Sequence, residues 1–244
     1  WIMQCKNNVN RGVFLKNTGC GLCNRKCRVD RDNGEKGFCG ETSEIRCGRA
    51  ALHMWEEPCI SGTRGSGTVF FTGCVLKCVF CQNSVLAESK VGKPVTVSRL
   101  AEIFLELQNK GAHNINLVTP THFVPSIRES IILSKKNGLS VPIVYNTGSY
   151  ESVDTIKSLE GLVDIYLPDL KYVSSELSKK YSKAGDYFEV ARKAIDEMVR
   201  QTGTSEFDDD GIMKKGVIVR HLLLPGCLSD SKNVIKYLRS EEHT

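Results

Sequence analysis

Three cysteines with the spacing Cys74-x3-Cys78-x2-Cys81 are the residues whose types and spacing most directly indicate chemistry in this chain. Closed zinc sites and fully ligated iron–sulfur clusters take four protein ligands. Three thiolates on one short loop can instead hold a [4Fe-4S] cluster and leave one iron open to a further ligand. We therefore expect reactive chemistry at this loop. The alternative is a structural zinc site that takes a fourth cysteine from elsewhere.

A short strand is expected directly before these cysteines. Residues 68–72 (TVFFT) are β-branched or aromatic, which is typical of a buried strand. The cysteine loop would then leave the carboxyl end of that strand. Functional sites of parallel α/β folds lie at this edge of the sheet.

The strand, the cysteine spacing, the aromatic Phe80 and the Asn83 that follows the last cysteine together resemble the signature of radical S-adenosylmethionine (SAM) enzymes. Residues 61–67 (SGTRGSG) are similar to the glycine-rich lead-in of pyruvate formate-lyase activating enzymes and their iron–sulfur relatives. The resemblance runs from about Ala50 to the C-terminus. It implies a [4Fe-4S] cluster at the three cysteines, SAM as cofactor, and reductive cleavage of SAM to a 5′-deoxyadenosyl radical.

The resemblance also implies partners. A low-potential donor of the flavodoxin or ferredoxin type would supply the electron, and the radical would act on a glycine of a protein substrate. A second hypothesis keeps the SAM chemistry but modifies another peptide or a small molecule. A third is a non-catalytic zinc-binding module that contacts nucleic acid or protein.

A second group of cysteines lies in residues 1–50, where glycines are frequent and periodic apolar segments are absent. A segment with so few apolar residues needs a bound metal in order to fold stably. The segment is therefore predicted to be a metal-binding module that holds zinc or a second iron–sulfur cluster, against the alternative of unrelated reduced thiols. The expected ligands are Cys20, Cys23, Cys27 and Cys39. A small nucleic-acid-binding finger is a rival hypothesis, suggested by Arg25, Lys26, Arg28 and Arg31, but a solvated face is simpler and we expect no nucleic-acid partner.

Strand and helix patterns alternate through residues 51–244, which predicts a parallel sheet with crossover helices. The resemblance implies a partial (β/α)6-type open barrel. Only five of its strands can be assigned, so we expect the last strand to be missing through truncation at the C-terminus. The expected strands are 68–72, 114–118, 141–145, 163–167 and 216–224, and the expected helices are 98–110, 124–136, 151–159, 186–201 and one that begins after residue 226.

The loops after these strands are the expected cofactor site. Asp169-Leu170-Lys171 matches the family's DxK segment, in which the lysine faces the cofactor carboxylate. Arg220 and His221 face opposite sides of the strand, so only one can point into the barrel. We expect this to be Arg220, whose charge the methionine carboxylate of the cofactor would offset. The family's GGE segment, which receives the amino group of the cofactor, is missing after the second strand. Thr121 or its neighbour His122 could accept hydrogen bonds from the cofactor in its place. The residues expected to contact SAM are Phe80, Asn83, Thr121, Asn146, Thr147, Ser149, Asp169, Lys171 and Arg220.

Composition bounds the remaining possibilities. The chain has 244 residues, is 41% hydrophobic and carries a formal net charge of +5, which is modest for its length. No apolar run approaches the roughly 18 residues of a membrane span, so we expect no membrane association. Eleven cysteines are an odd number clustered at ligand spacings, which favours a reducing cytoplasmic location over a disulfide framework. Free thiols are expected at Cys5, Cys47, Cys59 and Cys227.

Overall fold

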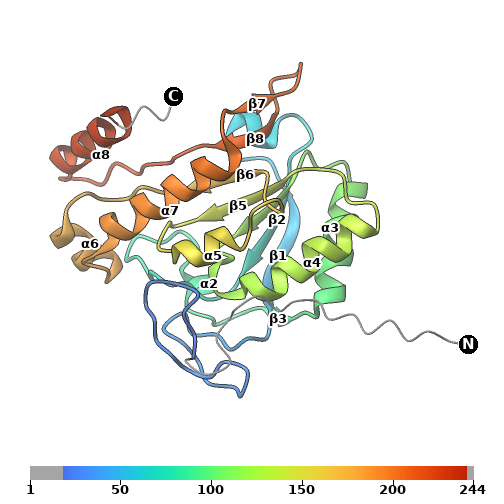
Figure 1. The fold of residues 1–244 in the computed structure, drawn as a ribbon, viewed down its shortest axis with the longest axis horizontal. Coiled ribbons are helices and arrows are strands. Elements are labelled where there is room, and N and C mark those ends of the chain that lie inside the picture. The colour runs from blue at the N-terminus through green and yellow to red at the C-terminus, as the bar shows by residue number, and fades with distance from the viewer. Residues whose placement is uncertain (1–18, 241–244) are drawn as a thin grey trace, which may run out of the picture.

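The computed structural model describes residues 19–240, and within that range one mixed sheet of eight strands forms the centre of the molecule (Figure 1). Its strand order is β3-β1-β2-β4-β5-β6-β8-β7, and the two outer strands do not meet, so the sheet is not closed. The strands are β1 Arg46–His53, β2 Ser66–Phe71, β3 Lys93–Pro94, β4 Ile115–Val118, β5 Ile143–Thr147, β6 Ile165–Pro168, β7 Glu206–Phe207 and β8 Met213–Val217.

The five predicted strands form the parallel core, since β2, β4, β5, β6 and β8 pair in parallel in that order. The antiparallel strands β1, β3 and β7 at the edges were not predicted. The fifth predicted strand was too long. It ends at Val217 rather than at residue 224, and beyond it only an isolated bridge joins Asp169 to Arg220. The α/β class and the open, partial barrel are therefore confirmed.

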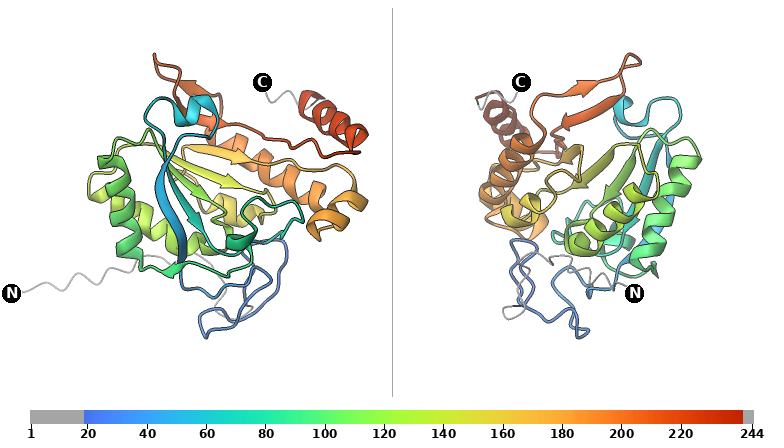
Figure 2. Two further views of the ribbon diagram at one scale, coloured as in Figure 1. Left: turned by 180° about the vertical axis from the view of Figure 1, so that it is seen from behind. Right: turned by 45° about the vertical axis from the view of Figure 1, so that its right-hand side comes forward.

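Helices α3, α4, α5 and α7 cover one face of the sheet, as both Figure 1 and Figure 2 show. The predicted helices are present. The cap of α3 is Thr96, whose hydroxyl accepts from the Arg99 amide. The helices are α1 Pro58–Ser61, α2 Ser84–Ala87, α3 Val97–Asn109, the 3-10 turn η1 Thr121–Phe123, α4 Val124–Lys136, α5 Val153–Lys157, α6 Ser175–Ser182, α7 Tyr187–Thr202 and α8 Leu228–Ser240.

Side-chain alternation along the strands separates an outer, helix-covered face of the sheet from an inner face. Tyr145 of β5 packs in the main core with residues of α3 and α4, whereas its neighbour Val144 packs with Ile60, Leu167 and Met213 in a smaller inner cluster. Because successive strand residues point to opposite faces, residues 144 and 146 share the inner face, and residues 145 and 147 share the outer one. This division decides which loop residues can face the barrel interior.

The described part of the N-terminal segment, residues 19–45, is called the cysteine module below. It contains no helix or strand element and lies beside the end of the sheet from which β2 leads into the cysteine loop (Figures 1 and 2). Residues 1–18 of the predicted module, with Cys5, lie outside the described residues. Cys47, Cys59 and Cys227 are half-buried and form no disulfide. Within residues 19–240 no helix has the length and apolar character needed to cross a membrane.

Candidate active site

The three cysteines after β2, Cys74, Cys78 and Cys81, are called the Cys triad. The chain turns from the strand at Gly73, whose φ is +78°. A Cβ there would stand 2.6 Å from Glu41 Cγ and 2.9 Å from the Cys39 carbonyl oxygen. Only glycine therefore fits between the strand end and the cysteine module.

Two cysteines of the triad accept hydrogen bonds at sulfur, which suits them to act as thiolate ligands. The Leu76 amide donates to Cys74 Sγ at 3.4 Å, and Ser182 Oγ donates to Cys78 Sγ at 2.9 Å. Donors aimed at sulfur stabilise the charged form that binds iron. The loop thus holds the cysteines between β2 and the last residue of α6, with hydrogen-bond donors beside two of the sulfur atoms.

Lys171 supplies the positive charge beside the triad. Burial raises the pKa of the Cys78 thiol, and the Lys171 ammonium acts in the opposite direction. Burial also raises the pKa of Cys81, where Lys171 again opposes the effect. Burial disfavours the charged form of Lys171 as well, yet the pKa of Lys171 is raised, because Asp169 and Cys78 stabilise its ammonium group. A cationic side chain therefore acts on Cys78 and Cys81, two of the three cysteines.

The loops after β5 and β6 converge on this lysine. Lys171 Nζ lies 2.6 Å from Asp169 Oδ2. A Cβ on Gly148 would stand 2.8 Å from Leu76 of the cysteine loop and 3.6 Å from Lys171 Cε. The neighbouring Ser149 is fully buried, and its hydroxyl has no hydrogen-bond partner among the described residues. The turn after β5 thus approaches both the triad and the lysine.

Arg220 points into the barrel, as the alternation argument predicted. Its Nη2 lies 2.6 Å from Asn146 Oδ1, and its Nε lies 3.0 Å from Asp169 Oδ1. Its Nη1 lies 3.5 Å from Glu56 Oε2 and 3.7 Å from Glu57 Oε1. Protein carboxylates therefore already offset the charge of Arg220, a role that the sequence interpretation had given to the cofactor carboxylate.

Asp169 connects the two cations. Burial favours its protonated form, but the pKa of Asp169 is lowered because Lys171 and Arg220 both stabilise the carboxylate. Glu56 shows the opposite balance, since burial outweighs Arg220 and raises its pKa. Glu56 and Glu57 were missed in the sequence. The signal for them was slight, a pair of carboxylates directly before the proline that starts α1.

The structure places Thr121 and Thr147 away from this inner group. The Thr121 hydroxyl donates to Glu151 Oε1 at 2.7 Å, and the Thr147 hydroxyl donates to the same oxygen. Glu151 is buried, and burial raises its pKa to about 7 against the lowering effect of the two hydroxyls. Both threonine hydroxyls are engaged on the outer face of the sheet, so neither is free to contact a ligand there.

The two histidines considered in the sequence serve the fold. The ring of His122 is fully buried with Nε2 2.6 Å from the Thr72 carbonyl oxygen, and burial lowers its pKa to about 3. His221 lies between the Leu170 carbonyl, 2.7 Å from Nδ1, and Ser231 Oγ of α8, 2.8 Å from Nε2. Both rings therefore join loops to neighbouring elements.

Phe80 and Asn83 remain beside the triad. The Phe80 ring packs edge-on against Tyr172, with centroids 6.5 Å apart. Asn83 is exposed directly before α2, and its backbone lowers the pKa of Cys81 by hydrogen bonding against the larger effect of burial. Both residues occupy the rim of the loop.

The Cys quartet, Cys20, Cys23, Cys27 and Cys39, gathers within the cysteine module. A Cβ on Gly37 would stand 3.2 Å from Cys27 Sγ and 3.4 Å from Cys39 Sγ, so these thiols face one another across a glycine. Burial raises the pKa of Cys23 to about 12, with smaller contributions from the charges of Cys20 and Cys39. Within residues 19–240 no group of three or more His, Cys, Asp or Glu side chains is arranged to hold a single metal ion.

Two of the four basic residues of the module bind the rest of the protein. Arg25 stacks on Phe38, and its Nε donates to the Val75 carbonyl at 2.8 Å. The buried Arg31 donates to the carbonyls of Glu41, Thr42 and His122. These two guanidinium groups hold the module against the barrel, which weakens the hypothesis of a nucleic-acid-binding finger.

A sequence model of the Radical SAM superfamily matches residues 68–206, which include the Cys triad, Asn146, Asp169 and Lys171. The chain therefore belongs to the radical SAM superfamily. Membership implies an enzyme with a [4Fe-4S] cluster and SAM as cofactors, and a requirement for a reductant. The chain is also 30% identical, over 236 residues and 93% of its length, to an uncharacterized protein of Methanocaldococcus jannaschii, and it spans 62% of that protein.

Proposed function

We propose that the Cys triad holds the [4Fe-4S] cluster, that the protein cleaves SAM reductively, and that the substrate is a glycine of a partner protein, as in glycyl-radical activating enzymes. The observation that carries the proposal is the convergence of Lys171 and the cysteine loop on the turn after β5, where a Cβ on Gly148 would stand 2.8 Å from Leu76 and 3.6 Å from Lys171 Cε. A half-buried cation beside the cysteine loop suits a site that must also take an anionic group of a ligand.

The remaining residues receive roles from their contacts. Lys171 would bind the carboxylate of SAM, and Asp169, 2.6 Å away, would hold the ammonium in place. Asn146 and Arg220 are joined at 2.6 Å and would fix the inner wall of the site. Ser149 offers a buried hydroxyl without a protein partner among the described residues, which suits a contact with the cofactor. Phe80 and Asn83 would border the bound cofactor at the rim.

A cluster held by Cys74, Cys78 and Cys81 would supply the one electron needed for reductive cleavage of SAM to methionine and a 5′-deoxyadenosyl radical. The chain's own residues orient the cofactor and exclude water. A protein substrate is supported by the likeness to activating enzymes and by the unclosed sheet, because a partial barrel leaves a side through which a loop of another protein can approach.

The first experiment tests the chemistry. Anaerobically reconstituted protein should absorb near roughly 400 nm and, once reduced with SAM present, release 5′-deoxyadenosine. Lys171→Met should keep its iron content but need more SAM and turn over roughly 10 to 100 times more slowly, since it loses a charge-assisted bond of about 1.5–3 kcal/mol. Lys179→Met, on the exposed side of α6, is the matched control. Colourless protein loaded with zinc would contradict the proposal.

The second experiment tests the substrate. A glycyl-radical enzyme encoded beside this protein should acquire an EPR doublet when incubated with the reduced protein and SAM. Release of 5′-deoxyadenosine without a glycyl radical would reject the activating function. It would favour the second hypothesis, modification of another peptide or a small molecule.

A further inference from the structure

The interior of the barrel contains two glutamates that Arg220 neutralises only in part. Glu56 Oε2 lies 3.5 Å and Glu57 Oε1 lies 3.7 Å from Arg220 Nη1, longer than the usual N–H···O range of about 2.7–3.2 Å. The Oε2 atom of Glu57 is buried and has no hydrogen-bond partner among the described residues. Burial raises the pKa of Glu56 although Arg220 opposes the effect. The guanidinium, which also binds Asp169 and Asn146, therefore leaves acceptors unused at both glutamates.

Asn116 gives an independent sign that a ligand belongs here. It lies within β4, paired with Thr68 on one side and Val144 on the other, and its side chain is fully buried. Because paired residues face the same side of a sheet, Asn116 shares the inner face with Val144. The Asn116 amide is close enough to Glu56 to favour its carboxylate, yet neither amide atom has hydrogen-bond geometry to any described residue. A buried amide without partners is costly, so its presence indicates a group that bonds to it.

The two glutamates enter the barrel from the end of the sheet opposite the Cys triad. Strand β1 is antiparallel to β2, so His53 at the end of β1 pairs with Ser66 at the start of β2, whereas the triad follows the end of β2. The loop after His53, in cyan in Figure 1, carries both glutamates and lies beside β7 and β8. A Cβ on Gly62 of this loop would stand 2.5 Å from Ile212 Cδ1. The glutamates are therefore separate from the residues that surround the triad.

Solvent reaches this part of the interior. The side chains of Glu57 and Arg220 stay 25% and 26% exposed although they contact each other inside the barrel. Strands β1 and β8, which flank the loop of the glutamates, do not pair with each other, so the sheet is open on this side. A ligand can therefore approach the group without unfolding the barrel.

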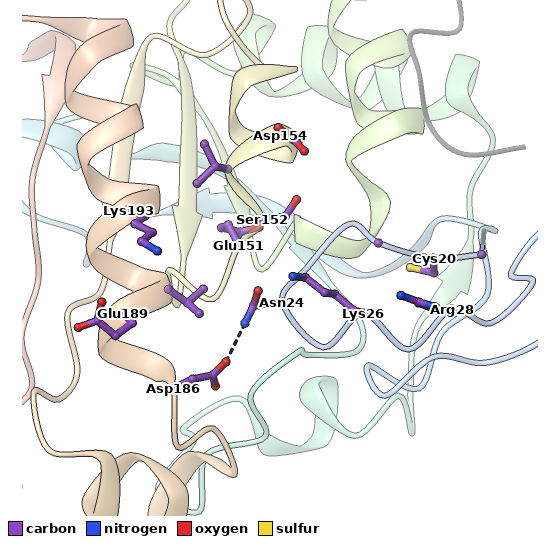
Figure 3. Close-up of a pocket in the computed structure, with 14 residues that line it drawn as sticks. Cys20, Asn24, Lys26, Arg28, Glu151, Ser152, Asp154, Asp186, Glu189 and Lys193 are labelled. Carbon is purple, nitrogen blue, oxygen red and sulfur yellow. Dashed lines mark hydrogen bonds between the residues drawn. The ribbon is translucent and has the colours of Figure 1, made fainter. Parts of the chain in front are cut away.

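The groove of about 770 Å³ beside the cysteine module is a separate feature (Figure 3). Its walls come from the module, from residues 151–154 and from α7 with the residue before it. Glu151 lines the groove, but its carboxylate is engaged by Thr121 and Thr147 on the outer face of the sheet, and Asp186 is bonded by Asn24. None of the residues that line the groove belongs to the interior group.

The unused acceptors suit a primary ammonium group. An ammonium carries one positive charge and three N–H donors, and the interior offers three acceptors in the Glu56 carboxylate, Glu57 Oε2 and Asn116 Oδ1. Hydrogen bonds from a cation to carboxylates are stronger than those between neutral groups. An anionic ligand would be repelled by the two carboxylates, and an apolar ligand would leave all three acceptors unpaired.

We propose that Glu56, Glu57 and Asn116 bind a primary ammonium group of the substrate and so position the substrate in the barrel opposite the Cys triad. The inference rests on the proposed function, because it assigns this site to the substrate of the same reaction. A lysine side chain near the target glycine of a partner protein is the source that fits that function. A free small-molecule amine is the other source of the same group.

Calorimetry on the anaerobically reconstituted full chain, without reductant, tests the site independently of SAM cleavage. The peptide acetyl-Gly-Lys-Gly-amide should bind at least about tenfold more tightly than the same peptide with norleucine, which lacks the ammonium. Equal affinity for the two peptides would overturn the proposal. Competitive displacement of the lysine peptide by SAM would also overturn it, because the site would then belong to the cofactor.

n-Butylammonium chloride, titrated in the same way, distinguishes the two sources of the ammonium. We expect the lysine peptide to bind at least about tenfold more tightly, which supports a protein segment. Equal or tighter binding of n-butylammonium would support the site with a small-molecule amine as its ligand. Absence of binding by both probes would overturn the site. A failed glycyl-radical test, by contrast, would reject the activating function and leave the binding of the peptide unchanged.

A charge variant tests the two glutamates. Glu56→Gln/Glu57→Gln should bind the lysine peptide about tenfold or more weakly and leave the affinity for the norleucine peptide unchanged. Glu102→Gln/Glu106→Gln, which alters two exposed carboxylates of α3, is the matched control and should bind both peptides as the wild type does. Wild-type affinity of the charge variant for the lysine peptide would overturn the proposal.

Asn116→Val separates recognition from a structural role. The change removes a buried amide that has no partner among the described residues, so the variant should melt at the wild-type temperature or above it. We expect its affinity for the lysine peptide to fall by about threefold to tenfold. Circular dichroism on the same sample verifies the fold. Unchanged affinity in the folded variant would overturn the role of Asn116 in the site.

Discussion

The two cysteine groups are positioned in different ways. The Cys triad follows β2, a buried strand paired on both sides, so the hydrogen bonds of the sheet fix the start of its loop. The Cys quartet lies in a segment without helix or strand elements and is held by the side chains of Arg25 and Arg31 and by glycines that admit close approach. Regular secondary structure thus positions the first group of cysteines, whereas the position of the second depends on a few side-chain contacts.

Loss of Arg31 should give the largest difference in stability between the cysteine module and the barrel. Arg31→Met leaves the carbonyls of Thr42 and His122 without this donor, whereas the Glu41 carbonyl keeps the Gly37 amide, and buried unsatisfied groups cost about 1–3 kcal/mol each. We expect the free energy of unfolding to fall by about 3 kcal/mol and proteolysis to begin within residues 19–45. Arg28→Met, at an exposed position, is the control. Cleavage that starts in the barrel instead would show that the module is not the weaker part.

Acid should weaken the support of the triad through His122. Its pKa is lowered to about 3 in the fold, so below its ordinary value of 6.5 the unfolded chain binds a proton that the folded chain does not. The stability present above pH 6.5 is therefore lost as the pH falls, by roughly 1.5 kcal/mol between pH 6.5 and 5. The free energy of unfolding, measured by chemical denaturation across this pH range, should depend less steeply on pH in His122→Gln than in the wild type. The same pH dependence in both proteins would show that the His122 ring is not buried in its neutral form.

A methyl group at Gly37 should affect only the quartet. The added Cβ would stand 3.2 Å and 3.4 Å from two thiols, closer than most Cβ contacts. We expect Gly37→Ala to weaken the predicted binding of metal, zinc or iron–sulfur, at the quartet by about twofold to fivefold, equivalent to roughly 0.4–1 kcal/mol, and to leave triad iron unchanged. Gly185→Ala, where a Cβ would make ordinary contacts, is the control. Equal loss at both sites would indicate that they assemble as one unit.

The smallest effect on turnover is expected at Thr121. Thr121→Val removes one of the two hydroxyls that bind Glu151 and should lower the free energy of unfolding by about 1 kcal/mol. The rate of 5′-deoxyadenosine release should stay within about twofold of wild type. A large rise in the SAM concentration needed for turnover would restore Thr121 to the cofactor site, as the sequence interpretation had it.

Much of this architecture was predictable because the βα alternation is local. Residues that follow neighbouring parallel strands meet at one sheet edge, so Asn146, Asp169 and Arg220 could be brought together from sequence. The unpredicted strand β1 (RCGRAALH) has no clear alternation and depends on pairing with β2, which is tertiary information. The last parallel strand was overestimated because residues 222 and 223 are apolar, although both leucines are more than half exposed.

The errors at the site follow from side-chain direction. Thr147 and Asn146 are adjacent, but they face opposite sides of the sheet, and the sequence gives no means of choosing between them without the register. Glu56 and Glu57 approach Arg220 from the loop between β1 and α1, which the sequence interpretation had not connected with the barrel interior. Such contacts between distant segments leave no periodic signal.

The two outermost strands have a consequence for how copies of this protein behave at high concentration. Each is only two residues long, Lys93–Pro94 at one margin and Glu206–Phe207 at the other. A proline and charged side chains at such margins discourage a foreign strand from adding itself to the array. An open sheet of this kind can therefore stay dispersed without closing into a full cylinder.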